Sequence, residues 1–428
     1  MTIPKPGGGE RELGVPTVTD RFLQEAVSQV LTPVFEPHFS DRSFGFRPGR
    51  IAHQAVKAAR RAIEAGRTWV VDVDLGRFFD RVQHDALMAR MARRVGDRRI
   101  LKLIRRYLDA GVLVEGVKVA TAEGTPQGSP LSRLLASIML DDPDAELERR
   151  GHAFVRYAGD LRVYVASERA ATRVLEGVTA FVEERLLLRV NQAKSGVAPA
   201  TMRGLLGFGF VRNAGQVRIR FDPRTKHRLK ARLHQLTDRH RSIAMAVRLA
   251  LHNRFLGGWT AYFAPAETPS VFDEFDEWLR RRLRQVRWKE GKGFAARRRN
   301  LRALGIPDWQ ARQWAASRRG YWRMAGSAPL RRALPNRHWA NLGLVALSDR
   351  VGRLREGWRT AGCGLACPVV WEGAVCRRPL RDPEGLIWVR PRSGLSGDAG
   401  SARGMGGSYR VTAPGSAQAS GTGVQAAE

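Results

Sequence analysis

Apolar positions recur at helical spacing near the start of the chain and at strand spacing in its middle. Residues 20–31, 51–65, 84–95 and 98–108 repeat apolar side chains every three or four positions and predict four helices. The β-branched run TWVVDVDL at 68–75 predicts a strand. Residues 153–166 predict two short strands around a tight turn at Ala158 and Gly159, and residues 171–187 predict an amphipathic helix. The segments LLGFGFV and QVRIRF predict a closing hairpin.

The remaining pattern divides the chain further. Residues 226–350 are mostly helical in pattern, very basic and rich in tryptophan. Beyond residue 360 Gly, Ser, Ala and Pro dominate, and residues 393–428 show no periodicity, which predicts a disordered tail. No apolar run is long enough to cross a membrane, and the first residues lack the apolar core of a signal peptide. Three cysteines exclude a disulfide scaffold. We therefore expect a cytoplasmic protein with no membrane partner.

Charge changes this picture more than composition does. The 428 residues carry 73 Lys and Arg against 41 Asp and Glu, a net charge of +32, and 64 of the basic residues are arginine. The hydrophobic content of 43% is ordinary for a globular protein, so a large core can form. So large an excess of basic residues predicts a polyanionic partner, with nucleic acid as the leading class.

Three carboxylates are the sharpest candidates for chemistry. Asp72 and Asp74 lie two residues apart in a predicted strand, so their side chains share one face. Asp160 follows the predicted turn of FVRYAGDLRVYV. Carboxylates from a strand end and a neighbouring hairpin can converge on two divalent ions for phosphoryl transfer, and Mg²⁺ suits an all-oxygen site. The alternative for Asp72 and Asp74 alone is a salt-bridged strand end.

Two further segments are candidate nucleic-acid contacts. The loop GTPQGSP (124–130) precedes a predicted helix, and it can contact a nucleotide or simply cap that helix. Residues 276–302 hold eleven Lys or Arg and three acids, in the pattern of a helix with an apolar seam and a basic face. Such a face is either solvated or bound to phosphates, and the net charge of +8 over the segment favours phosphates. The RNA-binding candidates are Arg280, Arg281, Arg284, Arg287, Arg297 and Arg298.

Together these motifs resemble a known family. The blocks IPKPGGGERELGVPTVTDRFLQEAV, SFGFRPGR, VVDVDLGRFFDRVQHD, TPQGSPLSRLLASIMLD, FVRYAGDLRVYV, NQAKSG and LLGFGF follow one another as in group II intron-encoded reverse transcriptases. The segment FDEWLRRRLRQVRWKEGKGFAARRRNLRALGI is similar to the maturase-specific domain of those proteins. The resemblance covers roughly residues 1–350.

The resemblance implies an α+β right-hand polymerase fold. Its expected parts are fingers at 1–70, a βαββαβ palm at 71–222, a helical thumb and maturase domain at 226–350, and the tail at 351–428. Asp74 resembles the palm metal ligand, Asp72 is a weaker candidate on the same face, and Asp160 is the remaining acid of the hairpin. Phe79 resembles the steric gate against a ribose 2′-hydroxyl, and Asp80 is expected to cap the following helix.

Other roles also follow from the resemblance alone. Gln127 and Gly128 resemble the loop that contacts the nucleotide and the template. Lys194 resembles the lysine that neutralises or protonates the leaving pyrophosphate, and Arg47 and Arg50 are candidate contacts to the triphosphate or template. The implied cofactor is Mg²⁺. The implied partners are group II intron RNA, an RNA template with a DNA primer, deoxynucleotide triphosphates and target DNA.

The sequence departs from the family pattern at three places. The family hairpin reads Tyr-Ala-Asp-Asp, whereas here Gly159 replaces the first aspartate, which is normally a metal ligand, so we expect weak metal binding and an impaired polymerase. Met1 falls inside the first shared block, so the N-terminal extension of relatives is expected to be missing. Near the end, Cys363, Cys367 and Cys376 lack a fourth ligand, and we expect neither a zinc site nor an endonuclease.

Three functions remain open at this stage. One is an intron-encoded reverse transcriptase that also assists splicing. Another is an RNA-binding maturase that has lost DNA synthesis. The third is a decayed mobile-element copy with neither activity.

Overall fold

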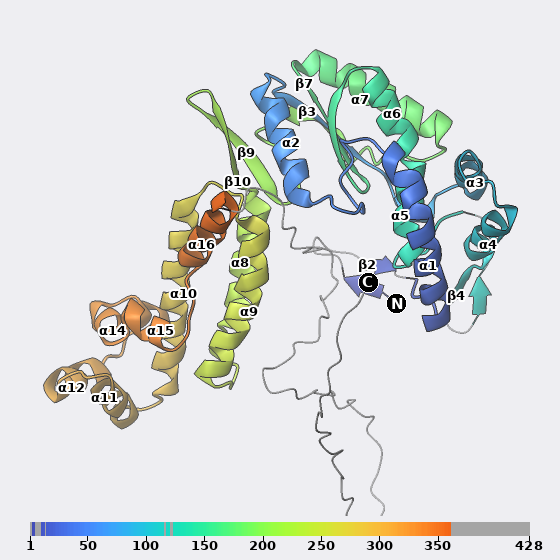
Figure 1. Cartoon of the computed structure of the whole chain (residues 1–428). Helices are drawn as coiled ribbons and strands as arrows, with labels where there is room; N and C mark the ends of the chain where they lie inside the picture. Colours follow the sequence, from blue (N-terminus) through green and yellow to red (C-terminus); the bar gives the residue numbers. More distant parts are fainter. Residues whose placement is uncertain (1, 5–9, 13, 115–116, 120–122, 361–428) are drawn as a thin grey trace, which may run out of the picture. The chain divides into compact units, whose positions relative to one another are not determined.

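The computed structural model describes residues 2–4, 10–12, 14–114, 117–119 and 123–360. The tail expected at 351–428 begins too early, because residues 351–360 are helical. Its remainder, 361–428, and the three cysteines lie outside the described residues. The described part is of the α+β class and contains three small two-stranded sheets beside one four-stranded sheet (Figure 1). None of its helices is long and apolar enough to cross a membrane.

The four-stranded sheet has the predicted βαββαβ order. Its strands are β3 (Trp69–Asp74), β6 (Ala153–Tyr157), β7 (Asp160–Val165) and β8 (Gly196–Pro199). They lie in the spatial order β6-β7-β3-β8, and every neighbouring pair is antiparallel. Four helices connect β3 to β6, namely α3 (His84–Ala92), α4 (Arg98–Asp109), α5 (Pro130–Met139) and α6 (Asp141–Arg149). Helix α7 (Glu168–Arg185) connects β7 to β8.

The two faces of this sheet belong to different cores because side chains alternate along a strand. Val71 and Val73 of β3 join a core that includes α7, α5 and α1 (Val18–Phe35). Val70 points to the other face and joins a second core with α2 (Ala52–Glu64). Asp72 and Asp74 follow Val70 along that second face, so the candidate acids begin where its apolar residues end.

The second core continues into the helical C-terminal part. It is built around the hairpin of β9 (Phe208–Asn213) and β10 (Gln216–Phe221), which is followed by α8 (Pro223–Leu236), α9 (Met245–Phe263) and α10 (Pro269–Glu290). Phe221, Trp259, Phe263 and Phe272 pack ring against ring where these elements meet. The remaining elements are α11 (Phe294–Ala303), α12 (Asp308–Ala315), α13 (Tyr321–Ala325), α14 (Ala328–Ala333), α15 (Asn336–Asn341) and α16 (Leu347–Thr360).

Element boundaries differ modestly from the sequence-based expectations. The helix expected at 20–31 runs from Val18 to Phe35, and the helix expected at 171–187 runs from Glu168 to Arg185. Two short hairpins were not expected: β1 (Thr2–Pro4) with β2 (Glu10–Glu12), and β4 (Val112–Val114) with β5 (Val117–Val119). Strands of three residues are too short to leave a readable alternation.

A buried ion pair holds the β6–β7 hairpin in place. Arg156 of β6 is 2% exposed and Asp144 of α6 is fully buried. The Arg156 Nε lies 2.8 Å from both Asp144 carboxylate oxygens, and its Nη1 donates to the Ala158 carbonyl at 3.2 Å. This pair therefore ties α6 to the turn that carries Gly159.

The SFGFRPGR segment packs on the other side of the same turn. Ser43 forms a bridge to Arg156, and the Phe44 amide donates to the Arg156 carbonyl at 2.8 Å. A Cβ at Gly45 would lie only 2.1 Å from the Ala158 nitrogen. Only glycine allows this approach of two backbones.

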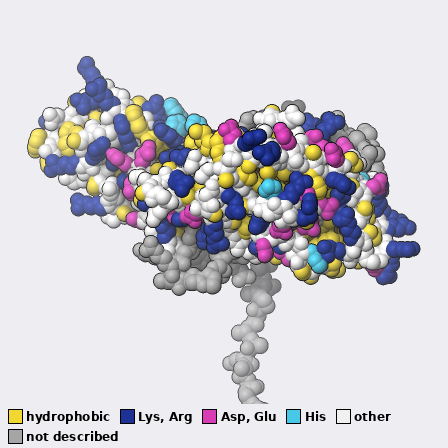
Figure 2. Space-filling view, turned by 90° about the horizontal axis from the view of Figure 1, so that it is seen from above, with side chains coloured by type: hydrophobic (Ala, Val, Ile, Leu, Met, Phe, Trp, Pro, Cys, Tyr) yellow, Lys and Arg dark blue, Asp and Glu magenta, His cyan; other side chains and the backbone are white. Residues whose placement is uncertain are grey.

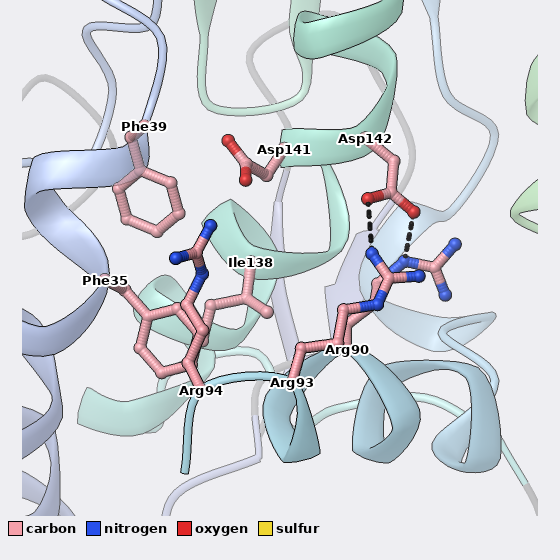
Figure 3. A pocket seen from close by; sticks show the side chains of 8 residues that line it. All are labelled: Phe35, Phe39, Arg90, Arg93, Arg94, Ile138, Asp141 and Asp142. Atoms are coloured by element: carbon pink, nitrogen blue, oxygen red, sulfur yellow. Dashed lines mark hydrogen bonds and ion pairs between the residues drawn. The ribbon is translucent and has the colours of Figure 1, made fainter.

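A pocket lies on the sheet side opposite the candidate acids. Its volume is about 250 Å³, and it is lined by Phe35, Phe39, Ile138, Asp141, Asp142 and three arginines of the α3 end (Figure 3). Arg90 and Arg93 both pair with Asp142, at 2.8 and 3.2 Å. Figure 3 shows the Asp141 carboxylate without such a partner. Burial, followed by the nearby Asp144 carboxylate, raises the pKa of Asp141 to about 6.

Gly45→Ala should cost about 3 kcal/mol of unfolding free energy or more, because the new methyl group forces two backbone segments apart. Denaturant unfolding measures this loss. The matched control is Gly258→Ala in α9, where a Cβ meets no atom within 4 Å. Removing glycine from that helix should raise stability by about 0.5–1 kcal/mol. Wild-type stability in Gly45→Ala would contradict the described packing.

Asp141→Asn should stabilise the fold at pH 7.5 by about 1–2 kcal/mol, after allowance for solvent screening. The folded pKa lies above the unfolded value, so the ionised carboxylate destabilises the fold increasingly as pH rises from about 4 through 6. The gain should therefore shrink towards pH 4. Asp142→Asn, which breaks two ion pairs, should lose stability at pH 7.5 instead. A gain independent of pH would contradict this explanation.

Candidate active site and nucleic-acid interface

The three candidate carboxylates share one face of the sheet. Asp74 of β3 lies directly opposite Asp160 of β7, and Asp72 lies directly opposite Arg162. Residues that face each other across antiparallel strands point to the same side, as do residues two apart in one strand. The structure thus brings together Asp72, Asp74 and Asp160, and it adds Arg162 among them.

Asp72 forms ion pairs with two arginines. Its Oδ2 lies 3.3 Å from Arg162 Nη2 and 3.6 Å from Arg203 Nη1. Arg162 is also anchored by a hydrogen bond to the Gly204 carbonyl. Burial raises the pKa of Asp72, although both arginines act in the opposite direction. The salt-bridged strand end, which the sequence left open as an alternative, describes Asp72.

Asp74 is held by the turn that precedes β8. Its amide donates to Ser195 Oγ at 2.9 Å, and its carbonyl accepts from the Asn191 amide at 2.8 Å. Lys194 of the same turn places its Nζ 3.7 Å from Asp74 Oδ2 and is otherwise largely exposed. The structure thus brings Lys194 to Asp74, and its role towards pyrophosphate stays a prediction.

The turn at Ala158 and Gly159 does not need a glycine at its second position. Ala158 adopts φ of 55°, in the left-handed region that non-glycine residues rarely enter. Gly159 does not have a positive φ, and a Cβ built there meets no atom within 4 Å. An aspartate would therefore be accommodated at 159. The missing carboxylate is a chemical difference that the backbone does not impose.

Asp80 and the GTPQGSP loop are joined beside the end of β3. Gln127 Nε2 donates to Asp80 Oδ1 at 3.3 Å, and the Thr125 amide donates to the Phe79 carbonyl at 2.6 Å. Gly128 has φ of 113°, and a Cβ there would lie 3.0 Å from the Gly14 carbonyl oxygen. The expected capping role of Asp80 is wrong, because α3 has Gln83 at its N-cap and Asp80 binds Gln127 instead.

Phe79 lies in the short 3-10 helix η2 (Phe78–Asp80), half-buried against the ring of Phe78 at 5.2 Å. Its expected contact with an incoming nucleotide stays a prediction. So do the expected contacts of Gln127 and Gly128.

Arg47 is an internal residue. It is 7% exposed, and all five of its N–H groups find acceptors in its own loop. Those acceptors are the Glu36 carboxylate and the carbonyls of Glu36, Phe39, Ser40 and Ser43. In this conformation Arg47 has no donor left for a triphosphate, so the structure does not support the expected contact. Arg50 is partly exposed and pairs with Asp41.

The predicted basic face of the α10 segment is largely used inside the protein. Arg284 is 4% exposed, and it donates to the carbonyls of Ala325 and Leu334. Those carbonyls end α13 and α14, where helices leave acceptors unpaired. Burial lowers the pKa of Arg284 to about 10. The expected RNA contact at Arg284 is therefore not supported.

Most of the other RNA-binding candidates contact neighbouring side chains of the protein. Arg281 lies over the Trp322 ring at 4.0 Å, and Arg297 lies over Trp288 at 4.7 Å. Arg287 pairs with Glu290, and Arg298 pairs with Asp308. Among the described residues, Arg280 makes no hydrogen bond or ion pair. Figure 2 shows basic side chains spread over the visible face and interspersed with acids, rather than gathered in one strip.

Sequence reasoning missed the cations of the sheet face. Arg162 and Arg203 neutralise Asp72, but their position depends on strand register and on the chain after β8. The alternation of Asp160 and Arg162 in β7 was a usable signal for Arg162. Arg203 left no comparable signal, because it lies outside a strand.

The candidate acids lie among cations. The described residues contain no group of three or more His, Cys, Asp or Glu side chains that could hold a metal ion. Arg162 and Arg203 pair with Asp72, and Lys194 pairs with Asp74, so three cations lie beside the three carboxylates.

Comparisons with known proteins agree with the motifs. The family model for reverse transcriptase (RNA-dependent DNA polymerase) matches residues 3–210. The model for the group II intron, maturase-specific domain matches residues 226–305. The βαββαβ sheet lies within the first match, and most of α8 and all of α9 and α10 lie within the second.

Individual relatives match over shorter stretches. Protein YkfC of Escherichia coli is 38% identical over 152 residues, which are 35% of this chain and 40% of that protein. Group II intron-encoded protein LtrA of Lactococcus lactis is 41% identical over 134 residues, 31% of this chain and 22% of that protein. The chain thus aligns with less than half the length of these curated relatives.

A telomerase structure from Candida tropicalis, in complex with a telomeric RNA fragment, is 14% identical. The match covers 83% of this chain and 63% of the telomerase chain. Its TM-score of 0.43 carries no information about activity. The family models and the ordered motifs carry the assignment instead. The fold is that of a right-hand polymerase with a βαββαβ palm and a helical thumb, and the chain belongs to the family of group II intron-encoded reverse transcriptases and maturases.

Proposed function

We propose that this protein binds group II intron RNA and assists its splicing, while its polymerase site is strongly impaired. The observation that carries the proposal is the sheet face on which Asp74 and Asp160 stand opposite each other with no carboxylate at Gly159. The maturase-specific match at residues 226–305 and the net charge of +32 support the RNA-binding half.

The impairment follows from charge and ligand number. Reverse transcriptases of this family generally use Mg²⁺. Here Asp72 is paired with two arginines and Lys194 lies beside Asp74, so any Mg²⁺ is weakly bound. Losing one carboxylate ligand removes several kcal/mol of transition-state stabilisation, which is roughly a thousandfold in rate.

The RNA-binding role rests on exposed basic side chains in the thumb. Helix α8 presents the exposed basic residues Arg224, Lys230 and Arg232, of which Lys230 and Arg232 lie within the maturase-specific match. Intron RNA is the proposed partner. An RNA template with a DNA primer, deoxynucleotide triphosphates and target DNA are partners only as far as polymerisation survives. Splicing itself would be catalysed by the RNA, so the protein contributes binding and ordering.

Gly159→Asp should raise primer extension about a thousandfold over wild type, because the turn accepts a side chain and the change restores the missing carboxylate. The assay uses an RNA template, a DNA primer, Mg²⁺ and nucleotides, with full-length protein. The matched control is the double variant Gly159→Asp with Asp74→Asn, which should be inactive. The proposed impairment would be contradicted if the wild type extended the primer as fast as an active reverse transcriptase of this family. It would also be contradicted if Gly159→Asp extended the primer no faster than the wild type.

Splicing of the associated intron RNA should accelerate when wild-type protein is added at low Mg²⁺, where RNA folding limits the reaction. Asp74→Asn should accelerate it equally, because the polymerase face is not used. Binding should weaken steeply with salt, by close to one unit of log–log slope for each duplex phosphate contacted. The proposed splicing function fails if the protein leaves splicing unchanged, or if its affinity for the RNA is flat between about 50 and 300 mM salt.

A further inference from the structure

The hairpin of helices α11 and α12 exposes a large aromatic side chain. Leu301, Ile306 and Ala311 are buried and fix the hairpin against the rest of the core. Trp309, in the first turn of α12, is 67% exposed. The apolar contacts that hold the hairpin are thus made by other residues, and the Trp309 indole is left to solvent.

Three arginines surround the carboxylate of Asp308, which precedes Trp309 in the sequence. Arg298 donates to both of its carboxylate oxygens at 2.7 and 2.6 Å. Arg302 and Arg312 approach the same carboxylate at 3.6 and 3.4 Å, and about three-fifths of each of their side chains is exposed. Arg312 also lies three residues after Trp309, so both side chains occupy neighbouring positions on one helix face. A net charge of +2 therefore adjoins the exposed indole.

The surrounding sequence leaves this charge unopposed. Residues 291–348 contain twelve Lys or Arg and a single acid, Asp308. That acid is shared among three guanidinium groups, so it orients Arg302 and Arg312 without cancelling them. Both keep N–H groups available for a second anion, since each has five donors.

Other tryptophans of this region differ from Trp309. Trp322 is 37% exposed, and the Arg281 guanidinium lies over its ring, 4.0 Å from the centroid. Trp339 is 1% exposed. Among the described residues, no cation or aromatic ring covers Trp309. Of these three, only Trp309 offers an open ring beside arginines that are held in position.

We propose that the α11–α12 hairpin binds an unpaired nucleotide of RNA, with the base stacked on Trp309 and the adjoining phosphates on Arg302 and Arg312. Stacking on an aromatic side chain is how proteins hold single-stranded bases, and it tolerates any base because each has a π-face. This site spans the end of the maturase-specific match at residue 305, with Arg302 inside the match and Trp309 and Arg312 beyond it. It rests on the proposed RNA-binding function and specifies single-stranded RNA as its ligand.

The test compares two fluorescein-labelled RNA hairpins with the same stem, one blunt and one carrying a short unpaired 3′ extension. For full-length protein, Trp309→Ala should weaken binding of the extended hairpin about 5- to 100-fold, as expected for one lost stacking contact. Trp309→Phe should lose much less. The blunt hairpin should bind both variants like wild type. The double variant Arg302→Gln, Arg312→Gln should lower the log–log salt slope for the extended hairpin by about 1.4.

The matched controls are Trp322→Ala, which removes the ring under the Arg281 guanidinium, and Arg173→Gln, an exposed arginine of α7. Neither should change the preference for the extended hairpin, and thermal melting verifies that each variant is folded. Equal binding of the extended hairpin by wild type and Trp309→Ala would overturn the site and favour an acidic protein partner there. Equal weakening of both hairpins would also overturn it. If wild type binds neither hairpin, the proposed RNA-binding function itself fails.

Discussion

The buried pair of Arg156 and Asp144 is the constraint on which the candidate polymerase face depends. Arg156 joins the sheet to α6, to the Ala158 carbonyl and to the loop that carries Gly45. Removing one partner of such a pair would leave an uncompensated buried charge and would cost about 3–5 kcal/mol. Because this anchor lies directly before the turn, it fixes where Gly159 and Asp160 stand relative to Asp74.

The shape of the turn also does not depend on the residue at position 159. The contacts that shape the turn are made by Arg156, by Gly45 and by backbone groups, and none of them uses the side chain at 159. Replacing an aspartate there by glycine removes a ligand without disturbing the fold.

The architecture and the shared face of the acids were predictable from sequence. Strand periodicity placed Asp72 and Asp74 on one side, and the motif order gave the βαββαβ topology. The environment of each residue was not predictable. Arg162 neutralises Asp72 only because of strand register, and Arg284 is buried because its long side chain reaches carbonyls at the ends of α13 and α14. Helical periodicity does not show which arginines end short helices and which face solvent. Part of the excess of basic residues is therefore structural. Arg248 and Arg282 are further examples, because they donate hydrogen bonds to carbonyls at the C-terminal end of α8.

Direct measurement of metal binding tests the central claim most closely. Mn²⁺ replaces Mg²⁺ in such a titration because its electron paramagnetic resonance signal reports the free ion. Wild-type protein should show no tight Mn²⁺ site, and Gly159→Asp should gain one that is lost again when Asp74 is also changed to Asn. A tight site in the wild type that depends on Asp74 and Asp160 would contradict the account.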